Sequence, residues 1–438
     1  MSKFKHTTVT AVVVANMIGT GVFTSLGFQL LDIQSGFVLL MLWAVGGIIA
    51  LSGAMTYAEL GAAMPRSGGE YNFLTRIYHP AIGFASGWVS ATVGFAGPTA
   101  LAAMTFAAYA MSSLGGEPNP WILKAIACGL IVILTLVHAS TRRNSGGLQV
   151  AFTVLKVAVI VAFCVAALWA TDTPQPVRFL FATEDVSLLT SGAFAVSLIY
   201  VSYAYTDWNA ATYRSGELDD PQRTLPRVLM VGTGLVMLLY LALNYVFLRV
   251  APIDAMVGQV EVGYIAATSA FGELGGRFTG MVLSLLLIST VSAMTVAGPR
   301  VLQVIGEDIK QLRLLARTNS DGVPSIAIAV QSSLAILFIL TSSFESVLIF
   351  SGFILALNSL VTVLGVFVLR IRQPDLPRPY RTFGYPITPL IYLSLTAWTL
   401  TFVIIDKTRE SMWGLAVIIA GLVAYALFPK QDQDKDRD

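Results

Sequence analysis

The stretch ANMIGTGVF, residues 15–23, lies within an apolar segment that is long enough to cross a membrane. Glycine costs about 1 kcal/mol of helix propensity relative to alanine, and here Gly19 and Gly21 flank the β-branched Thr20. A simple membrane anchor gains nothing from these residues. The pattern therefore has two explanations: a notch of small residues where another helix packs closely, or a helix that is interrupted at this point.

The composition indicates a polytopic membrane protein. Of the 438 residues, 55% are hydrophobic and only 12% are charged, whereas soluble domains are about 25% charged. The charges gather in short loops between apolar runs, and these runs have the length of about 20 residues that spans the hydrocarbon core of a bilayer.

We expect an all-α fold with twelve transmembrane helices. They are predicted near residues 8–31, 36–63, 80–113, 120–139, 147–170, 187–214, 225–249, 278–306, 324–342, 344–370, 386–405 and 411–428. The stretch 253–275 is expected to hold a short amphipathic helix. The basic start MSKFKHTT resembles a signal peptide, but the apolar run after it is too long and lacks a cleavage site, so we interpret it as an uncleaved first span.

The distribution of basic residues predicts the orientation. With the N-terminus inside, twenty of the 27 Lys and Arg residues fall in cytoplasmic segments and six fall outside. Positively charged loops stay on the cytoplasmic side. Both termini, including a solvated tail at 429–438, are therefore predicted to be cytoplasmic.

The sixth span carries a second polar interruption. The sequence AFAVSLIYVSYAYTDWNAATYRSGE, residues 193–217, gathers polar and aromatic side chains at 203–209. Among them, Asp207 is a carboxylate inside the membrane, which is costly unless it faces water or a partner.

The two interruptions fall at corresponding places in two halves of the chain. Residues 8–170 and 187–370 each hold five predicted spans, and each half opens with an interrupted helix. An odd number of spans gives the halves opposite orientations in the membrane, and paired interruptions of this kind mark transporter sites between inverted repeats. The free N–H groups of a broken helix suit a carboxylate, and its free carbonyls suit a cation. Residues 386–428 form two further helices.

Lys156 is a buried basic residue in the fifth span, within LQVAFTVLKVAVIVAFCVAALWA at 148–170. In one interpretation its long side chain reaches the cytoplasmic interface. In the other, its ammonium bonds to carbonyls of the interrupted first span and to hydroxyls of the eighth span, with Ser289 and Ser292 as candidates. In that position it would gate or couple transport.

No enzyme motif, metal site or cofactor site is predicted. The chain lacks a P-loop and a zinc-protease motif, and its three histidines stand apart from any cysteine pair. The two cysteines, Cys128 and Cys164, fall inside predicted spans and are interpreted as small buried residues.

The sequence resembles the amino acid–polyamine–organocation superfamily, and within it the L-type amino acid exchangers and their prokaryotic relatives. Four motifs carry the resemblance: MIGTGVF at 17–23, YAELGAAMPRSGGEYNFL at 57–74, WNAATYRSGELDDPQRTLPRVL at 208–229 and LRIRQPDLPRPYRTFGYPITPL at 369–390. They follow the family order and cover nearly the whole chain.

The resemblance implies a LeuT-type fold, in which two inverted repeats of five helices are followed by two C-terminal helices and helices 1 and 6 unwind at mid-membrane. It implies an amino acid substrate whose carboxylate binds amides of the first interruption and whose amino group binds carbonyls of the second. Tyr203 matches an aromatic gate, and Lys156 matches a lysine that replaces a sodium ion. The implied substrate-binding residues are Ile18, Gly19, Thr20, Gly21, Tyr203, Ala204, Tyr205, Thr206 and Asp207.

Two departures from the family pattern stand out. L-type exchangers have two glycines before the Trp-Asn pair, whereas this chain has Thr206 and Asp207. Asp207 either binds a cationic group of the substrate or faces away and pairs with a neighbour. The animal exchangers join a partner subunit through a cysteine between spans 3 and 4, but the loop SSLGGEPNPW at 112–121 has none, so no disulfide-linked partner is expected.

The sequence therefore predicts a permease in the cytoplasmic membrane of a prokaryote. We expect it to transport amino acids by alternating access without sodium, either as an exchanger or as a symporter coupled to protons, with no nucleic-acid partner. An amine, polyamine or cationic amino acid carrier is the alternative within transport. A sensor or scaffold that binds amino acids without moving them is the alternative from another class.

Overall fold

The computed structural model describes residues 10, 13–14, 17–66, 68–116, 119–140, 146–209, 211–212 and 220–427, without the side chains of 146–153, 221 and 308. Parts of the predicted spans 8–31, 187–214 and 411–428, and the tail 429–438, lie outside these residues. The helices are α2 (Gly21–Gln29), α3 (Gly36–Ala63), α4 (Gly69–Ile77), α5 (Pro80–Val89), the π-helical turn η1 (Ser90–Gly94), α6 (Ala96–Ser113), α7 (Pro120–Ser140), α8 (Gly146–Ala170), α9 (Asp185–Leu189), α10 (Gly192–Tyr205), α11 (Pro221–Val250), α12 (Ile253–Met256), α13 (Val262–Ala297), α14 (Pro299–Asp308), the 3₁₀-helix η3 (Lys310–Ala316), α15 (Ser325–Thr341), α16 (Phe344–Arg372), α17 (Ile387–Asp406) and α18 (Thr408–Leu427).

Local capping explains where several helices begin. The hydroxyl oxygens of Ser35, Ser191 and Ser343 accept hydrogen bonds from N–H groups in the first turns of α3, α10 and α16. Pro80 opens α5, where its missing N–H is harmless. As a result, α3 coincides with the predicted span 36–63, and α5, η1 and α6 together coincide with the span 80–113.

Pro98 explains the π-helical turn in the third span. Proline has no N–H, and its ring clashes with the carbonyl four residues earlier, which here belongs to Gly94. The helix widens at Ser90–Gly94 and resumes as α6 from Ala96. The inserted turn changes which side chains face the interior, and Ser90, Gly94 and Phe95 all line the central cavity described below.

The region before the eighth span contains a short helix, as the sequence predicts. After the short α12, α13 begins at Val262 and consists of two helical parts that meet at a kink at Gly272. Gly272 has a φ of 74°, a conformation that side chains disfavour and glycine adopts freely. The part before the kink lies within the predicted stretch 253–275, and the part after it begins within a few residues of the predicted start of the eighth span at 278.

Eight helical segments of the described chain are long and apolar enough to cross a membrane, and three shorter apolar helices accompany them. The outer face of the molecule carries large apolar side chains, such as Ile133 and Leu136 on α7, which are 61% and 67% exposed. Soluble proteins rarely expose such surfaces. Trp121, Trp169 and Trp413 are exposed at helix ends, where tryptophan favours the membrane interface. The protein is thus a multi-pass membrane protein.

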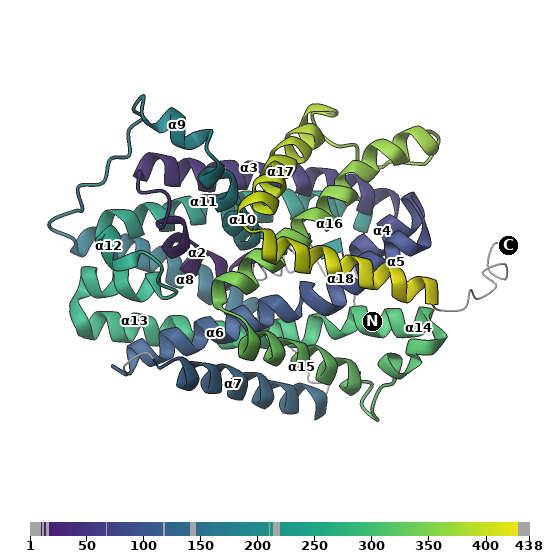
Figure 1. Ribbon diagram of the computed structural model, residues 1–438, viewed down its shortest axis with the longest axis horizontal. Coiled ribbons are helices and arrows are strands. Elements are labelled where there is room, and N and C mark those ends of the chain that lie inside the picture. The colour runs from purple at the N-terminus through teal and green to yellow at the C-terminus, as the bar shows by residue number, and fades with distance from the viewer. Residues whose placement is uncertain are drawn as a thin grey trace.

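The helices form two groups that meet around α2 (Figure 1). In one group, α6, α7, α13 and α15 pack against one another. In the other, α3 packs against α11 and α10, and α2 packs against α10. Helix α8 touches α11 and α13 and so joins the two groups, while α16 packs against α3, α6 and α10.

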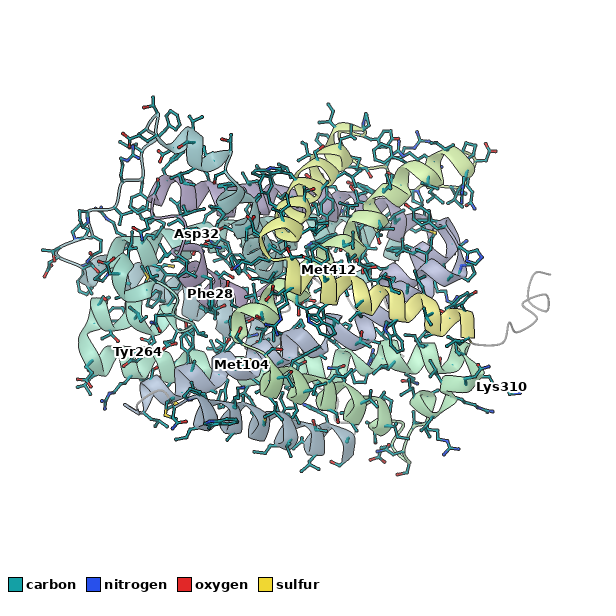
Figure 2. All side chains as sticks on the ribbon, in the orientation of Figure 1. Phe28, Asp32, Met104, Tyr264, Lys310 and Met412 are labelled. Carbon is teal, nitrogen blue, oxygen red and sulfur yellow. The ribbon has the colours of Figure 1, made fainter. Side chains whose placement is uncertain are left out.

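Loop residues predicted to lie on opposite sides of the membrane are found at opposite ends of the molecule. Asp32 and Tyr264, which belong to predicted outer segments, lie toward one end in Figure 2, and Lys310, from a predicted inner segment, lies at the other. Phe28 lies inside the molecule, where its ring stacks on Phe344 at 5.6 Å between centroids.

Candidate binding site at two helix interruptions

The first interruption lies at Ile18–Thr20. Residues 10, 13, 14 and 17 are helical, the next three residues form bends, and α2 begins at Gly21. The N–H of Gly19 donates to the carbonyl of Met17 at 2.7 Å, which makes a tight turn in place of a helical bond. The side chain of Thr20 does not cap α2, and no acidic residue lies in its first turn. Its N-terminal N–H groups are thus available to an anion.

The second interruption follows Tyr205, where α10 ends. Thr206 turns the chain: its N–H donates to the carbonyl of Tyr203 at 3.0 Å, and its hydroxyl donates to the carbonyl of Ser202 at 3.0 Å. Asp207 then has a φ of 74°. That left-handed conformation costs a residue other than glycine about 1–2 kcal/mol, although aspartate tolerates it better than most.

The two interruptions touch each other. A Cβ atom on Gly21 would lie 2.4 Å from the Cα atom of Ala204, so only glycine permits this approach of α2 to α10. The hydroxyl of Ser25 donates to the carbonyl of Tyr200 at 3.3 Å, and the side chain of Tyr203 interacts with that of Thr20. The sequence posed a choice between a packing notch and a break. The structure has both: the break lies at 18–20 and the notch at Gly21.

Tyr240 of α11 bridges the two interruptions, and the sequence analysis missed it. Its hydroxyl lies 2.5 Å from the carbonyl oxygen of Met17 and 3.1 Å from that of Ala204, so its single hydrogen serves the ends of both broken helices. Its ring contacts Trp43 and Tyr205 at centroid distances of 5.5 and 5.0 Å. The only sequence signal was a tyrosine in the middle of an otherwise apolar span.

Lys156 of α8 binds the first interruption directly. Its side-chain nitrogen Nζ donates to the carbonyl of Ile18 at 3.2 Å and to the hydroxyl of Thr290 at 2.8 Å, and the residue is only 6% exposed. The alternative interpretation, in which this side chain reaches the cytoplasmic interface, does not match this geometry. An ammonium supplies strong donors to a carbonyl that the broken helix leaves free.

The hydroxyl partner of Lys156 differs from the two candidates that the sequence suggested. Ser289 bonds to the carbonyl of Leu286 in its own helix at 2.7 Å, and Ser292 pairs with the ring of His138 at 2.8 Å. Thr290 lies between them. Successive residues of a helix are turned by about 100°, so an error of one position rotates the side chain away from the site.

A cavity of about 60 Å³ lies beside the second interruption. Tyr205, Thr206 and Asp207 line it together with residues of α3, η1, α16 and α17, whereas Ile18–Gly21, Tyr203, Ala204 and Lys156 lie outside its lining. Asp207 is thus part of the cavity wall, and no hydrogen bond or ion pair joins it to another described residue.

Glu70, at the start of α4, ties four elements together on the rim of this cavity. Its carboxylate accepts hydrogen bonds from Tyr57 of α3, from Asn209 after α10 at 3.2 Å, and from Asn358 and Ser359 of α16, the latter at 2.9 Å. These contacts connect the second interruption to α16.

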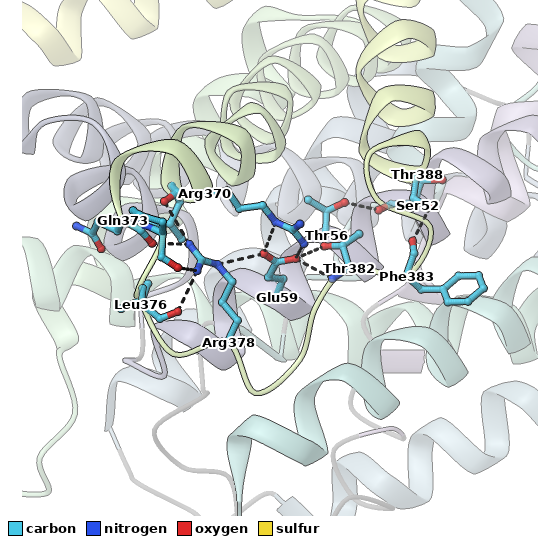
Figure 3. Close-up of polar contacts among 12 residues, drawn as sticks. Ser52, Thr56, Glu59, Arg370, Gln373, Leu376, Arg378, Thr382, Phe383 and Thr388 are labelled. Atoms are coloured by element: carbon cyan, nitrogen blue, oxygen red, sulfur yellow. Dashed lines mark hydrogen bonds and ion pairs between the residues drawn. The ribbon is translucent and has the colours of Figure 1, made fainter.

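Glu59, near the end of α3, is the centre of a separate ionic cluster (Figure 3). It is fully buried and accepts from Arg370 at 2.9 and 2.7 Å, and from the N–H and the hydroxyl of Thr382, each at 2.7 Å. Arg378 approaches to 3.5 Å. The cluster fastens the loop between α16 and α17 to α3, and so it joins two of the sequence motifs, those at 57–74 and 369–390.

Within the described ranges, no group of three or more His, Cys, Asp and Glu side chains is placed to hold a metal ion. What the arrangement offers is a pair of helix ends: N–H groups at the start of α2 and carbonyls at the end of α10, held in contact inside a membrane protein. These suit a small ligand that carries both an anionic and a cationic group.

The chain is similar in sequence to known amino acid transport proteins. The sequence model of the family described as "Amino acid permease" matches residues 4–424. The chain is 30% identical to the large neutral amino acids transporter small subunit 2 of Mus musculus, over 95% of this chain and 79% of that protein. It is 27% identical to the serine/threonine exchanger SteT of Bacillus subtilis, over 94% and 93% of the two chains, and 27% identical to the b(0,+)-type amino acid transporter 1 of Mus musculus, over 95% and 86%.

The close approach of the two interruptions gives a first prediction. We expect Gly21→Val to weaken binding of a radiolabelled amino acid by about 10-fold or more, because overpacking of this kind costs about 1–3 kcal/mol and forces α2 away from Ala204. Gly234→Val is the matched control, since a Cβ there meets nothing within 4 Å. Equal affinity in both purified variants would show that the contact does not matter for binding.

The contacts of Lys156 give a second prediction. Thr290→Val leaves a buried ammonium short of one acceptor and is expected to lower amino acid uptake by about 10-fold, as is Lys156→Met, which removes the donor. Ser289→Ala changes a hydroxyl one position away and is expected to leave uptake near the wild-type rate. The double variant Lys156→Met, Thr290→Val should be no worse than Lys156→Met alone. A larger loss in Ser289→Ala than in Thr290→Val would contradict the assignment.

Proposed function

Since this chain belongs to the amino acid permease family and is an amino acid transporter rather than an enzyme, we propose that it works as a secondary transporter by alternating access across the cytoplasmic membrane. The observation that carries the proposal is the contact between the interrupted ends of two membrane helices, at Gly21 and Ala204. Broken helices are tolerated in a membrane only where they line a site or are buried in protein.

We propose the twelve-span arrangement in which residues 8–170 and 187–370 are inverted repeats and 386–428 add two helices. The two groups of helices support it, because α6, α7, α13 and α15 come from equivalent places in the two halves, as do α2, α3, α10 and α11. With twelve spans, an even number, both termini lie on the same side of the membrane, and the distribution of Lys and Arg assigns that side to the cytoplasm.

We propose that the substrate binds through the carboxylate and the ammonium group that all amino acids share. Its carboxylate is proposed to bind at Ile18–Gly21, through the N–H groups of Thr20 and Gly21, because those of Ile18 and Gly19 already donate to the carbonyls of Val14 and Met17. The positive end of the α2 dipole favours an anion there. Its ammonium is proposed to bind carbonyls at the end of α10, from Tyr203 to Thr206. Tyr203 lies against Thr20 and is buried, as expected of an aromatic side chain that covers the site.

Lys156 supports a transporter that does not need sodium. Its ammonium already occupies the carbonyl of Ile18, which in a broken helix is a typical acceptor for a coupling cation. A second cation at this carbonyl would be repelled. Without sodium, transport is driven either by exchange of amino acids or by coupling to protons. We favour exchange, because the similar bacterial protein is named a serine/threonine exchanger.

We further propose a prokaryotic cytoplasmic membrane as the location and no disulfide-linked partner. The bacterial relative matches this chain over nearly its full length. The loop between α6 and α7 contains no cysteine, and Cys128 and Cys164 are both free thiols within helices. The similar proteins named above are amino acid transporters or exchangers, which supports an amino acid carrier over an amine or polyamine carrier and over a sensor.

Uptake into proteoliposomes tests the proposed function. Purified protein should import radiolabelled amino acids without sodium, and import should rise several-fold when the vesicles are preloaded with unlabelled amino acid. Repeating the assay at two pH values with empty vesicles measures proton coupling, and protein-free vesicles are the control. Import of polyamines but of no amino acid would refute the proposal, as would an absolute requirement for sodium.

A further inference from the structure

The loop between α16 and α17, residues 373–386, is fastened in place although it forms neither a helix nor a strand. Thr382 donates from both its N–H and its hydroxyl to the buried carboxylate of Glu59, at 2.7 Å each. The ring centroid of Tyr385 lies 3.6 Å from the guanidinium carbon of Arg370, which is a cation–π contact. These contacts fix the position of the loop against α3 and α16.

The fastened loop displays an apolar surface next to the start of α17. Phe383 directly follows Thr382 and is 76% exposed, and Figure 3 shows its ring directed away from the ionic cluster. The hydroxyl of Thr388 donates to the carbonyl of Phe383 at 2.6 Å, which ties this residue to the first turn of α17. On α17 itself, Ile387 and Leu390 are 66% and 47% exposed and lie on one face of the helix.

This apolar surface continues the lipid-facing side of α17. The helix is long and apolar enough to cross a membrane, so its exposed face with Ile387 and Leu390 contacts lipid acyl chains. Phe383 lies just before the helix begins and extends the same surface toward the lipid headgroups. Exposed apolar side chains beside basic residues are typical of segments that lie in the membrane interface.

A positive charge lies beside the apolar surface. Arg381 is exposed, and no hydrogen bond or ion pair joins it to another residue that the structure describes. Behind it, Arg370 and Arg378 share the single carboxylate of Glu59. Asp375 is the only acidic residue of the loop. Three arginines therefore accompany two carboxylates, and the loop attracts an anion.

The combination of Arg381 and Phe383 favours a phospholipid over a soluble anion. A guanidinium group binds phosphate through paired hydrogen bonds. A free phosphate would use Arg381 and leave the exposed ring of Phe383 in water. An anionic phospholipid satisfies both residues, because its phosphate pairs with the arginine while its acyl chains cover the apolar surface.

We propose that this loop binds an anionic phospholipid of the cytoplasmic leaflet, with the lipid phosphate on Arg381 and an acyl chain along Phe383 and Ile387. The Glu59 cluster holds the loop in the position that this contact requires. The assignment to the cytoplasmic leaflet follows from the orientation proposed above. The contact itself involves no amino acid substrate, so it stands or falls independently of the proposed transport function.

Native mass spectrometry of the purified full-length protein tests the proposal. The protein is titrated with phosphatidylglycerol, which is anionic, and with phosphatidylcholine, whose headgroup has no net charge. The wild type is expected to bind phosphatidylglycerol more tightly. Arg381→Gln should raise Kd for phosphatidylglycerol about fivefold, the effect of removing one basic residue near an anionic lipid, and leave Kd for phosphatidylcholine unchanged. Phe383→Ala should raise Kd for both lipids by about three- to tenfold, because it removes apolar contact area.

Two matched controls alter exposed residues elsewhere. Arg409→Gln changes an exposed arginine near the start of α18, and Phe278→Ala changes a phenylalanine of α13 that is 73% exposed. Neither is expected to change either Kd. All four residues are exposed, so none of the variants should lower the melting temperature.

Three outcomes would overturn the lipid assignment. The first is equal affinity of the wild type for the two lipids. The second is a loss in Arg409→Gln or Phe278→Ala as large as that in the matching loop variant. The third is displacement of phosphatidylglycerol by an equal concentration of glycerol phosphate, which would identify a site for a free phosphate instead.

Discussion

The structure depends on one constraint: every backbone N–H and carbonyl inside a membrane needs a partner, because lipid offers none. Two helices are interrupted, at Ile18–Thr20 and after Tyr205, and leave backbone groups without helical partners. Side chains from other elements bond to several of these groups. Lys156 binds the carbonyl of Ile18, and Tyr240 binds those of Met17 and Ala204. These bonds go to carbonyls. The N–H groups at the start of α2 are what the arrangement leaves for a ligand.

The acidic residues near α3 and α4 divide into two kinds. Glu59 is saturated by Arg370, Arg378 and Thr382 and fixes a loop to α3, a structural contact whose loss would leave a buried charge. Glu70 joins the end of α10 to α16 through hydrogen bonds from Asn209 and Ser359, so it connects the second interruption to a neighbouring helix.

Much of the fold was predictable because its signals are local. Apolar length placed α3, α5 and α16 within a few residues, and the structure shows Ser35, Pro80 and Ser343 at their starts. The glycines and polar residues at 18–21 and 206–209 located both interruptions. Which side chains of a helix face a given neighbour was not predictable in the same way. The eighth span is apolar on most of its surface, so its sequence does not reveal that Thr290, and not Ser289 or Ser292, faces Lys156. Tyr240 and the partners of Glu70 are set by contacts between distant segments, which no local sequence signal reports.

The central claim is that the two interruptions, held in contact at Gly21 and Ala204, form the place where an amino acid is bound. A structure of the protein in lipid nanodiscs with a transported amino acid tests it most directly. The account predicts the substrate carboxylate within about 3 Å of N–H groups at Ile18–Gly21 and its ammonium at the same distance from carbonyls at the end of α10. Substrate density elsewhere, with both helix ends unoccupied, would contradict it.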